Sequence, residues 1–200
     1  MKREEKNALS RQRILDAAMR EFSARGYEGA SLNTVCTEYG ISKGIIYHYF
    51  KDKDELYLLC TEKCFNEITA YLEETAKQLS GTVEQKLQTY FDARLCFFAN
   101  NPLYLGIFAD AALNPPDALS AEIAQSRKKF DELNISVLTG LLNSKPLREG
   151  LAVEAIVEDF RIYMDFFNLR FKTSFDGKNT LETALHEHEK RCHRQLGMLL

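Results

Sequence analysis

Hydrogen-bond donors gather in the segment Ser42–Phe50 of this 200-residue chain, which reads SKGIIYHYF. Positions 43–49 hold a lysine, a glycine, two tyrosines and a histidine. Ammonium and hydroxyl groups donate to phosphate oxygens, and a glycine lets a helix approach a DNA duplex closely. A solvated helix surface usually carries mainly Glu and Lys, so this composition predicts a surface that contacts nucleic acid.

Two short helices joined by a tight turn are expected to present these side chains. Ser31 and Ser42 can cap the two helices, because a serine hydroxyl accepts a hydrogen bond from an amide of the first turn. Gly40 would end the first helix with a positive φ, which costs glycine little. The residues expected to point inward follow helical spacing; they are Leu32, Val35, Tyr39, Ile46 and Phe50. This arrangement is a helix-turn-helix, whose second helix enters the major groove of DNA.

The stretch Ser10–Leu56 resembles the DNA-binding domain of tetracycline-repressor (TetR) family regulators. Residues 40–56, GISKGIIYHYFKDKDEL, contain every fixed position of the family pattern G-[IV]-S-K-G-x-[IL]-Y-x-[YH]-F-x-x-K-x-[ED]-L. The match covers about a quarter of the chain. Cys36 departs from the alanine more often found there, a change between two small residues.

The resemblance implies a role in DNA binding for particular side chains. Ile45 would contact a thymine methyl group, and Tyr47 would contribute to base and phosphate contacts. Lys53 opens the following helix and would face a phosphate. His48 has an ordinary surface histidine as its alternative. The predicted DNA-binding residues are Ser31, Ser42, Lys43, Gly44, Ile45, Tyr47, His48, Tyr49 and Lys53.

Composition restricts the class of protein. The chain has 26 Lys and Arg against 29 Asp and Glu, and this net charge of −3 argues against a non-specific nucleic-acid coat. The five cysteines show no paired framework and are expected as free thiols. No segment resembles a signal peptide or an apolar span of about 20 residues, so a cytoplasmic protein is expected. The basic N-terminus, which Glu4 and Glu5 interrupt, is expected to be frayed rather than a DNA-contacting arm.

The sequence predicts an all-α fold of about nine helices, without a strand pattern or an internal repeat. We expect a helix-turn-helix domain over residues 1–56 and a helical effector-binding and dimerisation domain over residues 57–200. Outside the helix-turn-helix, the expected helices span about 10–25, 53–79, 82 onward, 103–113, 119–142, 153–171 and 180 to the end. The predicted inner face of the helix over 119–142 comprises Ile123, Phe130, Leu133, Val137 and Leu141. The chain stops on an apolar run, Gly197–Leu200, so we expect the natural protein to continue.

The last two predicted helices carry the stripes that suit a dimer interface. Two such helices from each of two subunits would close a four-helix bundle, as the family resemblance implies, and a homodimer would read a palindromic operator. The alternative is that both stripes only fill the core of one subunit. The stripes are Ile156, Phe160, Tyr163, Phe167 and Phe171 in the first helix and Leu181, Leu185, His188, Cys192, Leu196 and Leu199 in the second.

The resemblance also implies a small-molecule cavity in the body of the protein, whose occupant would release the repressor from DNA. An aromatic lining with few polar groups suits a hydrophobic or aromatic effector, although aromatic residues at helical spacing are more often plain core. The candidate lining residues are Arg94, Phe97, Phe98, Tyr104, Phe108, Asp110, Phe130, Phe160 and Tyr163.

Three other classes of protein compete with this interpretation. A metal or redox sensor would use the pairs Cys60 and Cys64, and His188 and Cys192, although two ligands are fewer than the four of a structural zinc site. A helical enzyme lacks support, because the sequence contains no phosphate loop, HExxH motif or nucleophile elbow. A helical protein-interaction module without DNA function is the third. We therefore expect no enzymatic activity, no cofactor and no bound metal.

Overall fold

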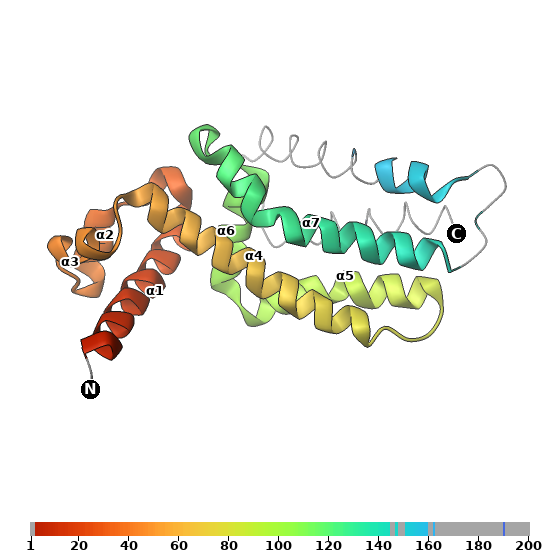
Figure 1. Cartoon of the computed structure of the whole chain (residues 1–200), viewed down its shortest axis with the longest axis horizontal. Helices are drawn as coiled ribbons and strands as arrows, with labels where there is room; N and C mark the ends of the chain where they lie inside the picture. Colours follow the sequence, from red (N-terminus) through yellow and green to blue (C-terminus); the bar gives the residue numbers. More distant parts are fainter. Residues whose placement is uncertain (1–2, 145–146, 148–150, 160–161, 163–189, 191–200) are drawn as a thin grey trace. The chain divides into compact units, whose positions relative to one another are not determined.

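The computed structural model describes residues 3–144, 147, 151–159, 162 and 190. These residues form two compact units: residues up to Phe65 with Asn101–Arg127, and Asn66–Asn100 with the described residues from Lys128 onward. The helices are α1 (Arg3–Gly29), α2 (Leu32–Tyr39), α3 (Lys43–Tyr49), α4 (Lys53–Lys77), α5 (Val83–Asn100), α6 (Pro102–Leu113), the 3-10 helix η1 (Asp117–Leu119) and α7 (Ser120–Leu142) (Figure 1). The predicted all-α class is confirmed, and residues 153–159 add a further helical segment.

Helix α1 begins at Arg3, well before the predicted start at Ser10. Glu4 and Glu5 lie in its first turn, where negative charge is favourable next to the positive end of the helix dipole. The N-terminus is therefore helical from Arg3 onward, and residues 4–9 are exposed, as expected of a solvated start. The predicted end at Gly26 is confirmed as a break, because this glycine has φ 65° and ψ −179° within the helical stretch.

The first unit contains α6 as well as the helix-turn-helix. α6 packs against α1, and a side chain on Gly106 would collide with the backbone carbonyl of Ser23. Large fully buried side chains from several helices fill the unit. They include Ile14, Phe22, Ile46, Phe50, Leu56, Tyr57 and Ile107. The division predicted at residues 56 and 57 stays a prediction, but α6 shares a compact unit with the N-terminal helices.

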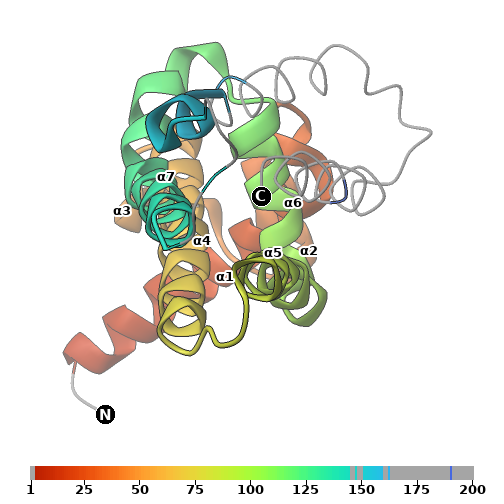
Figure 2. The same ribbon diagram turned by 90° about the vertical axis from the view of Figure 1, so that its right-hand side faces the viewer.

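The second unit has a core built from α5, α7 and residues 153–157. Its buried members are Val83, Leu87, Phe91, Leu138, Leu142 and Ile156. The part of α4 after Phe65 runs beside α5 in both views (Figures 1 and 2), and the rings of Tyr71 and Phe97 have centroids 5.5 Å apart. Thr82 and Gln85 form a capping box: the Thr82 amide donates to Gln85 Oε1 over 2.9 Å, and the Gln85 amide donates to Thr82 Oγ1 over 3.3 Å.

Two predictions about buried faces are met only in part. On α7, Ile123 and Phe130 are buried as predicted, and Leu141 is half-buried against the core. Leu133 and Val137 are half-buried, whereas Leu138 and Leu142, which were not in the predicted set, are buried. Ile156, the first residue of the predicted dimer stripe, is 2% exposed and belongs to the core of its own subunit. The rest of both dimer stripes lies outside the described residues, as does the predicted helix from residue 180, apart from Lys190. Among the helices of the described residues, none combines the length and the apolarity that crossing a membrane requires.

Candidate nucleic-acid interface

Serine side chains cap both helices of the helix-turn-helix, as the sequence predicts. The Asn33 amide donates to Ser31 Oγ over 3.2 Å, and the Ile45 amide donates to Ser42 Oγ over 3.3 Å. Gly40 has φ 60° and ψ 40°, the left-handed conformation expected at the end of α2. Gly40 and the Ser42 bond therefore shape the turn between α2 and α3, and the Ser31 bond starts α2.

Helix α3 divides cleanly into an inward and an outward face. Ile46 is fully buried, and Phe50 at the C-cap is 1% exposed. Ile45 and Tyr47 are 46% and 49% exposed, so both side chains face away from the core. The remaining predicted contact residues of the outward face, Lys43, Gly44 and His48, are also exposed.

The exposed face has features that the fold itself does not require. A Cβ atom added to Gly44 would meet nothing within 4 Å, so packing within the protein does not demand a glycine there. The Lys43 ammonium lies 6.0 Å from the centroid of the Tyr47 ring, so one cation and one phenol stand together. Another molecule could therefore approach the backbone of α3 closely at Gly44, next to the hydrogen-bond donors of Lys43 and Tyr47.

Tyr49 differs from its neighbours on α3. It is half-buried, its hydroxyl donates to Asn7 Oδ1 over 3.1 Å, and its ring meets the edge of His48 with centroids 4.8 Å apart. The bond to Asn7 ties the C-terminal end of α3 to the first turns of α1. The predicted DNA contact of Tyr49 stays a prediction, but its hydroxyl is engaged within the protein.

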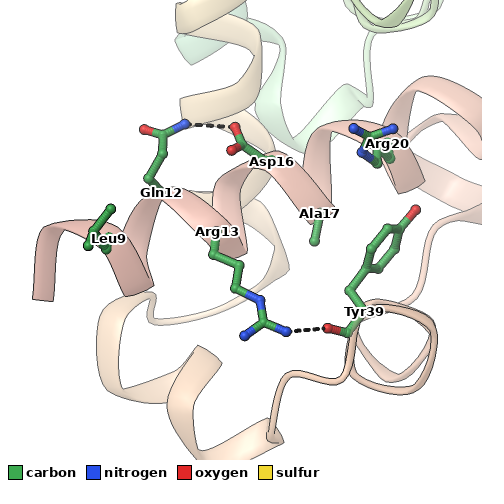
Figure 3. A pocket seen from close by; sticks show the side chains of 7 residues that line it. All are labelled: Leu9, Gln12, Arg13, Asp16, Ala17, Arg20 and Tyr39. Carbon is green, nitrogen blue, oxygen red and sulfur yellow. Dashed lines mark hydrogen bonds between the residues drawn. The ribbon is translucent and has the colours of Figure 1, made fainter. Parts of the chain in front are cut away.

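Helix α1 supplies contacts to the helix-turn-helix that the sequence interpretation missed. Arg13 Nη2 donates to the backbone carbonyl of Tyr39 over 2.9 Å, and the Arg11 guanidinium lies 5.1 Å from the centroid of the Phe50 ring. A shallow pocket of about 510 Å³ opens beside Arg13 on the surface of α1 (Figure 3). It is lined by Leu9, Gln12, Arg13, Asp16, Ala17, Arg20 and Tyr39.

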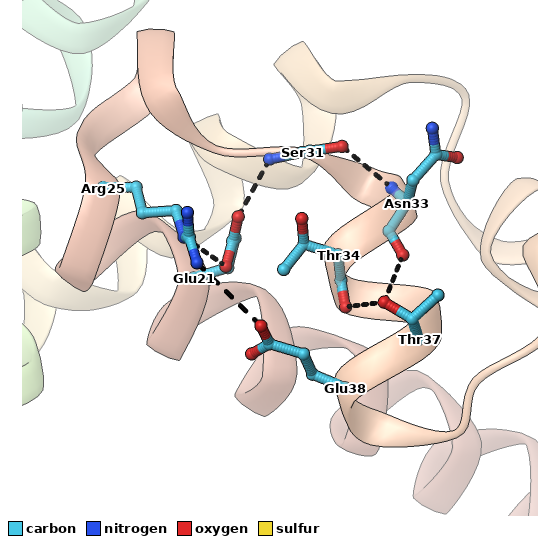
Figure 4. Close-up of polar contacts among 7 residues, drawn as sticks. All are labelled: Glu21, Arg25, Ser31, Asn33, Thr34, Thr37 and Glu38. Carbon is cyan, nitrogen blue, oxygen red and sulfur yellow. Dashed lines mark hydrogen bonds and ion pairs between the residues drawn. The ribbon is translucent and has the colours of Figure 1, made fainter.

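A buried carboxylate holds the start of α2. Glu21 is 3% exposed, accepts a 3.0 Å hydrogen bond from the Ser31 amide, and pairs with Arg25 Nε over 3.3 Å (Figure 4). Arg25 Nη2 lies 3.9 Å from Glu38 Oε1, so its guanidinium spans from α1 to α2. The hydroxyl of Thr37 donates back to the carbonyl of Asn33 over 3.1 Å. Glu21 thus binds the backbone amide of Ser31, and the Ser31 hydroxyl is left to cap α2.

Asp52 and Glu55 cap the start of helix α4. The Glu55 amide donates to Asp52 Oδ1 over 2.9 Å, and Glu55 Oε2 accepts from the Lys51 amide over 2.6 Å. The bond from the Glu55 amide is the main reason that the pKa of Asp52 lies below its usual value. Lys53, the first residue of α4, places its ammonium 4.3 Å from the centroid of the Tyr27 ring.

The candidate effector residues are divided between the two units. Arg94, Phe97, Phe98 and Phe130 are buried in the second unit, where the rings of Phe97 and Phe98 have centroids 5.5 Å apart. Tyr104, Phe108 and Asp110 lie on α6 in the first unit. Phe160 and Tyr163 lie outside the described residues. The predicted cavity lining stays a prediction.

Asp110 has a defined role within the first unit. Its Oδ2 atom accepts hydrogen bonds from the Tyr27 amide and the Tyr57 hydroxyl, each over 2.7 Å. Burial is the largest influence on this carboxyl group and raises its pKa, although both hydrogen bonds act in the opposite direction. The side chain is thus occupied in joining α6 to α1 and α4.

The cysteine pair of the metal or redox alternative is deeply buried. Cys60 and Cys64 are both 0% exposed, and burial raises the pKa of each thiol. A thiol that stays protonated is a poor nucleophile and a poor metal ligand. Within the described residues, no group of three or more His, Cys, Asp or Glu side chains is arranged to hold a metal ion. His188 and Cys192 lie outside those residues.

The chain is similar to known bacterial transcriptional regulators. Residues 14–60 match the model for bacterial regulatory proteins of the tetR family. The negative transcriptional regulator IcaR of the biofilm operon icaADBC, from Staphylococcus epidermidis, is 22% identical over 184 residues, which cover 87% of this chain and 94% of IcaR. The transcriptional repressor AcnR of Corynebacterium efficiens is 39% identical over 80 residues, 40% of each chain.

Solved structures share the fold. The transcriptional regulator FadR from Bacillus subtilis, crystallised with stearoyl-CoA, superposes with a TM-score of 0.65 at 19% identity, over 90% of this chain and 95% of FadR. A TetR family regulator from Agrobacterium tumefaciens gives a TM-score of 0.68 at 16% identity, over 94% of this chain and 98% of its own. The match to the family model begins within α1 and spans α2, α3 and the start of α4, so it includes the donor-rich surface of α3.

Proposed function

Because this chain belongs to the TetR family and is a DNA-binding transcriptional regulator, we propose that it is a dimeric repressor that reads a palindromic operator with the exposed face of α3. The observation that carries the proposal is the exposure of Ile45 and Tyr47 beside Lys43 on a helix whose opposite face is buried. A protein-interaction module without DNA function does not account for the family match at residues 14–60.

Base reading in this proposal depends on the outward residues of α3. Ile45 provides an apolar surface for a thymine methyl group, and Lys43 and Tyr47 provide donors for base edges and phosphates. Gly44 lets the helix backbone approach the groove, because a Cβ there would point into open space. His48 lies at the edge of this surface and would contact the sugar-phosphate chain.

Phosphate contacts would come from the residues that start the helices. Ser31 and Ser42 already bond to amides of their own helices, so their hydroxyl groups would add a donor for a nearby phosphate. Lys53 stands at the positive end of the 25-residue helix α4, where an anion is favoured. Tyr49 would act mainly through its bond to Asn7 by bracing α3.

The small size of the reading element favours a dimer. Helix α3 has seven residues and reaches only a few base pairs, so two copies related by a two-fold axis would supply the affinity of a specific repressor. Repression requires only that the bound protein occupy a promoter, and the relatives IcaR and AcnR are named as a negative regulator and a repressor. The protein would act in the cytoplasm, where chromosomal DNA lies.

The input would be a small hydrophobic or aromatic molecule. The second unit contributes the buried aromatic side chains Phe97, Phe98 and Phe130 beside the buried Arg94. FadR, which shares the fold, was crystallised with an acyl-CoA, a long apolar chain joined to an anionic carrier. A ligand that binds one conformation more tightly would shift the protein away from the DNA-competent state.

Selection of bound duplexes from a random pool tests this function. The protein should enrich a palindrome whose two half-sites lie about one helical turn or a multiple of it apart. Enrichment of no sequence, or of a single half-site by a monomer, would contradict the proposed dimeric repressor.

A further inference from the structure

Tyr27, near the end of α1, makes four contacts with α4 and α6. Its backbone amide donates to Asp110 Oδ2 over 2.7 Å, and its hydroxyl donates to Asp54 Oδ1 over 2.6 Å. Its ring lies 4.3 Å from the Lys53 ammonium and 5.0 Å from the ring of Tyr57. All of these residues belong to the first compact unit, so the contacts form one continuous cluster.

The carboxylate of Asp110 lies so close to Gly26 that a side chain at position 26 would collide with it. Gly26 has φ 65°, and a Cβ atom there would lie 2.6 Å from Asp110 Oδ1. The second donor to this carboxylate, the Tyr57 hydroxyl, comes from a residue that is 0% exposed. Asp110 of α6 is therefore fixed by α4 and in turn fixes the backbone at Tyr27.

The contact between Lys53 and Tyr27 restricts a side chain that is normally free. A lysine side chain loses rotamer entropy when it is immobilised. A cation over an aromatic face is attracted to it, so the Tyr27 ring offsets part of this cost before any ligand arrives. The hydrogen bond to Asp54 is the main cause that raises the pKa of Tyr27 to about 12, so its phenol remains a neutral donor at ordinary pH.

We propose that Tyr27 is a positioning residue for DNA binding: it holds the Lys53 ammonium at the start of α4, and Asp110 of α6 holds Tyr27. This inference rests on the proposed contact between Lys53 and a phosphate. It makes operator affinity depend on residues of α1 and α6 that touch no DNA. A tyrosine that only filled space would contribute to folding and leave the affinity of the folded protein unchanged.

A double-mutant cycle measures this dependence with the selected operator duplex. Lys53→Gln should weaken binding and reduce the magnitude of the salt slope by roughly 0.9 for each phosphate that the lysine neutralises. Tyr27→Leu should weaken binding about two- to fivefold per half-site, the range of an exposed cation–π contact. In the Lys53→Gln background, Tyr27→Leu should have no further effect. Tyr27→Phe keeps the ring and should recover most of the affinity.

A measurement on the free protein guards against a variant that folds poorly. The ε-methylene protons of Lys53 should show an upfield ring-current shift in the NMR spectrum of the native protein and of Tyr27→Phe. Equal decreases in affinity from Tyr27→Leu in both backgrounds, or the absence of that shift, would overturn the positioning role. If the shift is present but Lys53→Gln alters neither affinity nor salt slope, the proposed phosphate contact itself is wrong, and the inference is overturned with it.

Discussion

The hydroxyl of Tyr49, at the end of α3, donates a 3.1 Å hydrogen bond to Oδ1 of Asn7 in the second turn of α1. The bond makes the orientation of α3 depend on the first turns of α1. Tyr49→Phe and Asn7→Ala should each lower the free energy of unfolding by about 0.5–1.5 kcal/mol, the net value of one hydrogen bond. Urea unfolding of both single variants and of the double variant tests this, and decreases in stability that add fully would show that the pair does not interact.

Asp110 should tolerate removal of its charge but not removal of its acceptor. Both donors reach the same oxygen, and the Oδ1 of an asparagine has two lone pairs for them. Asp110→Asn should therefore change the free energy of unfolding by less than about 1 kcal/mol. Asp110→Leu leaves the buried Tyr57 hydroxyl without this acceptor and should cost about 1–3 kcal/mol.

Denaturant unfolding at neutral pH distinguishes these two variants. Because burial raises the pKa of Asp110, the ionised carboxylate carries a desolvation cost that the asparagine avoids. A large decrease in the stability of Asp110→Asn, equal to that of Asp110→Leu, would show that the negative charge itself is needed at this joint.

Tyr27 gives the stability of the protein an alkaline pH dependence. Its pKa is raised from 10.0 to about 12, chiefly by the hydrogen bond to Asp54. The folded state therefore keeps this proton more tightly than the unfolded state, and its stabilising contribution is complete below pH 10 and is lost as the pH rises toward 12. The stability difference between the native protein and Tyr27→Phe should shrink over that interval. Unfolding free energies measured from about pH 8 to 11 would contradict this if the difference stayed constant.

The buried thiols should resist alkylation in the folded protein. Cys60 and Cys64 are 0% exposed with a raised pKa, whereas Cys96 is exposed. Iodoacetamide should label Cys96 before Cys60 and Cys64 and reach that buried pair only after unfolding, because the thiolate is the reactive form. Peptide mass mapping reports each site separately. Labelling of Cys60 or Cys64 as fast as that of Cys96 would favour the redox-sensor alternative.

The local features of the site were predictable from the sequence because their hydrogen bonds span few residues. Ser31, Ser42, Asp52 and Thr82 each bond to an amide two or three residues away, so a short motif contains both partners. Gly40 was predictable for the same reason, since the end of a short helix favours a residue that accepts positive φ.

The tertiary contacts were not predictable in this way. Tyr49 and Asn7 are 42 positions apart, and Tyr27 and Asp110 are 83 apart, so no periodic pattern links either pair. The sequence shows only that Asp110 lies on an apolar helix, so Asp110 was predicted to bind the effector. Its hydrogen bonds to Tyr27 and Tyr57 come from distant parts of the chain. The sequence interpretation missed the start of α1 because Glu4 and Glu5 interrupt a basic arm, although acidic residues in the first turn stabilise a helix.

The role of the exposed face of α3 is tested most directly by the sequence discrimination of Tyr47→Ala. Its affinity for the selected operator and for a scrambled duplex should be measured at several salt concentrations. We predict that binding to the operator weakens by roughly 1–3 kcal/mol per half-site and binding to the scrambled duplex by much less, so that discrimination falls. Undiminished discrimination in Tyr47→Ala and in Lys43→Ala, with the same salt slope as the native protein, would contradict a DNA-reading role for this face.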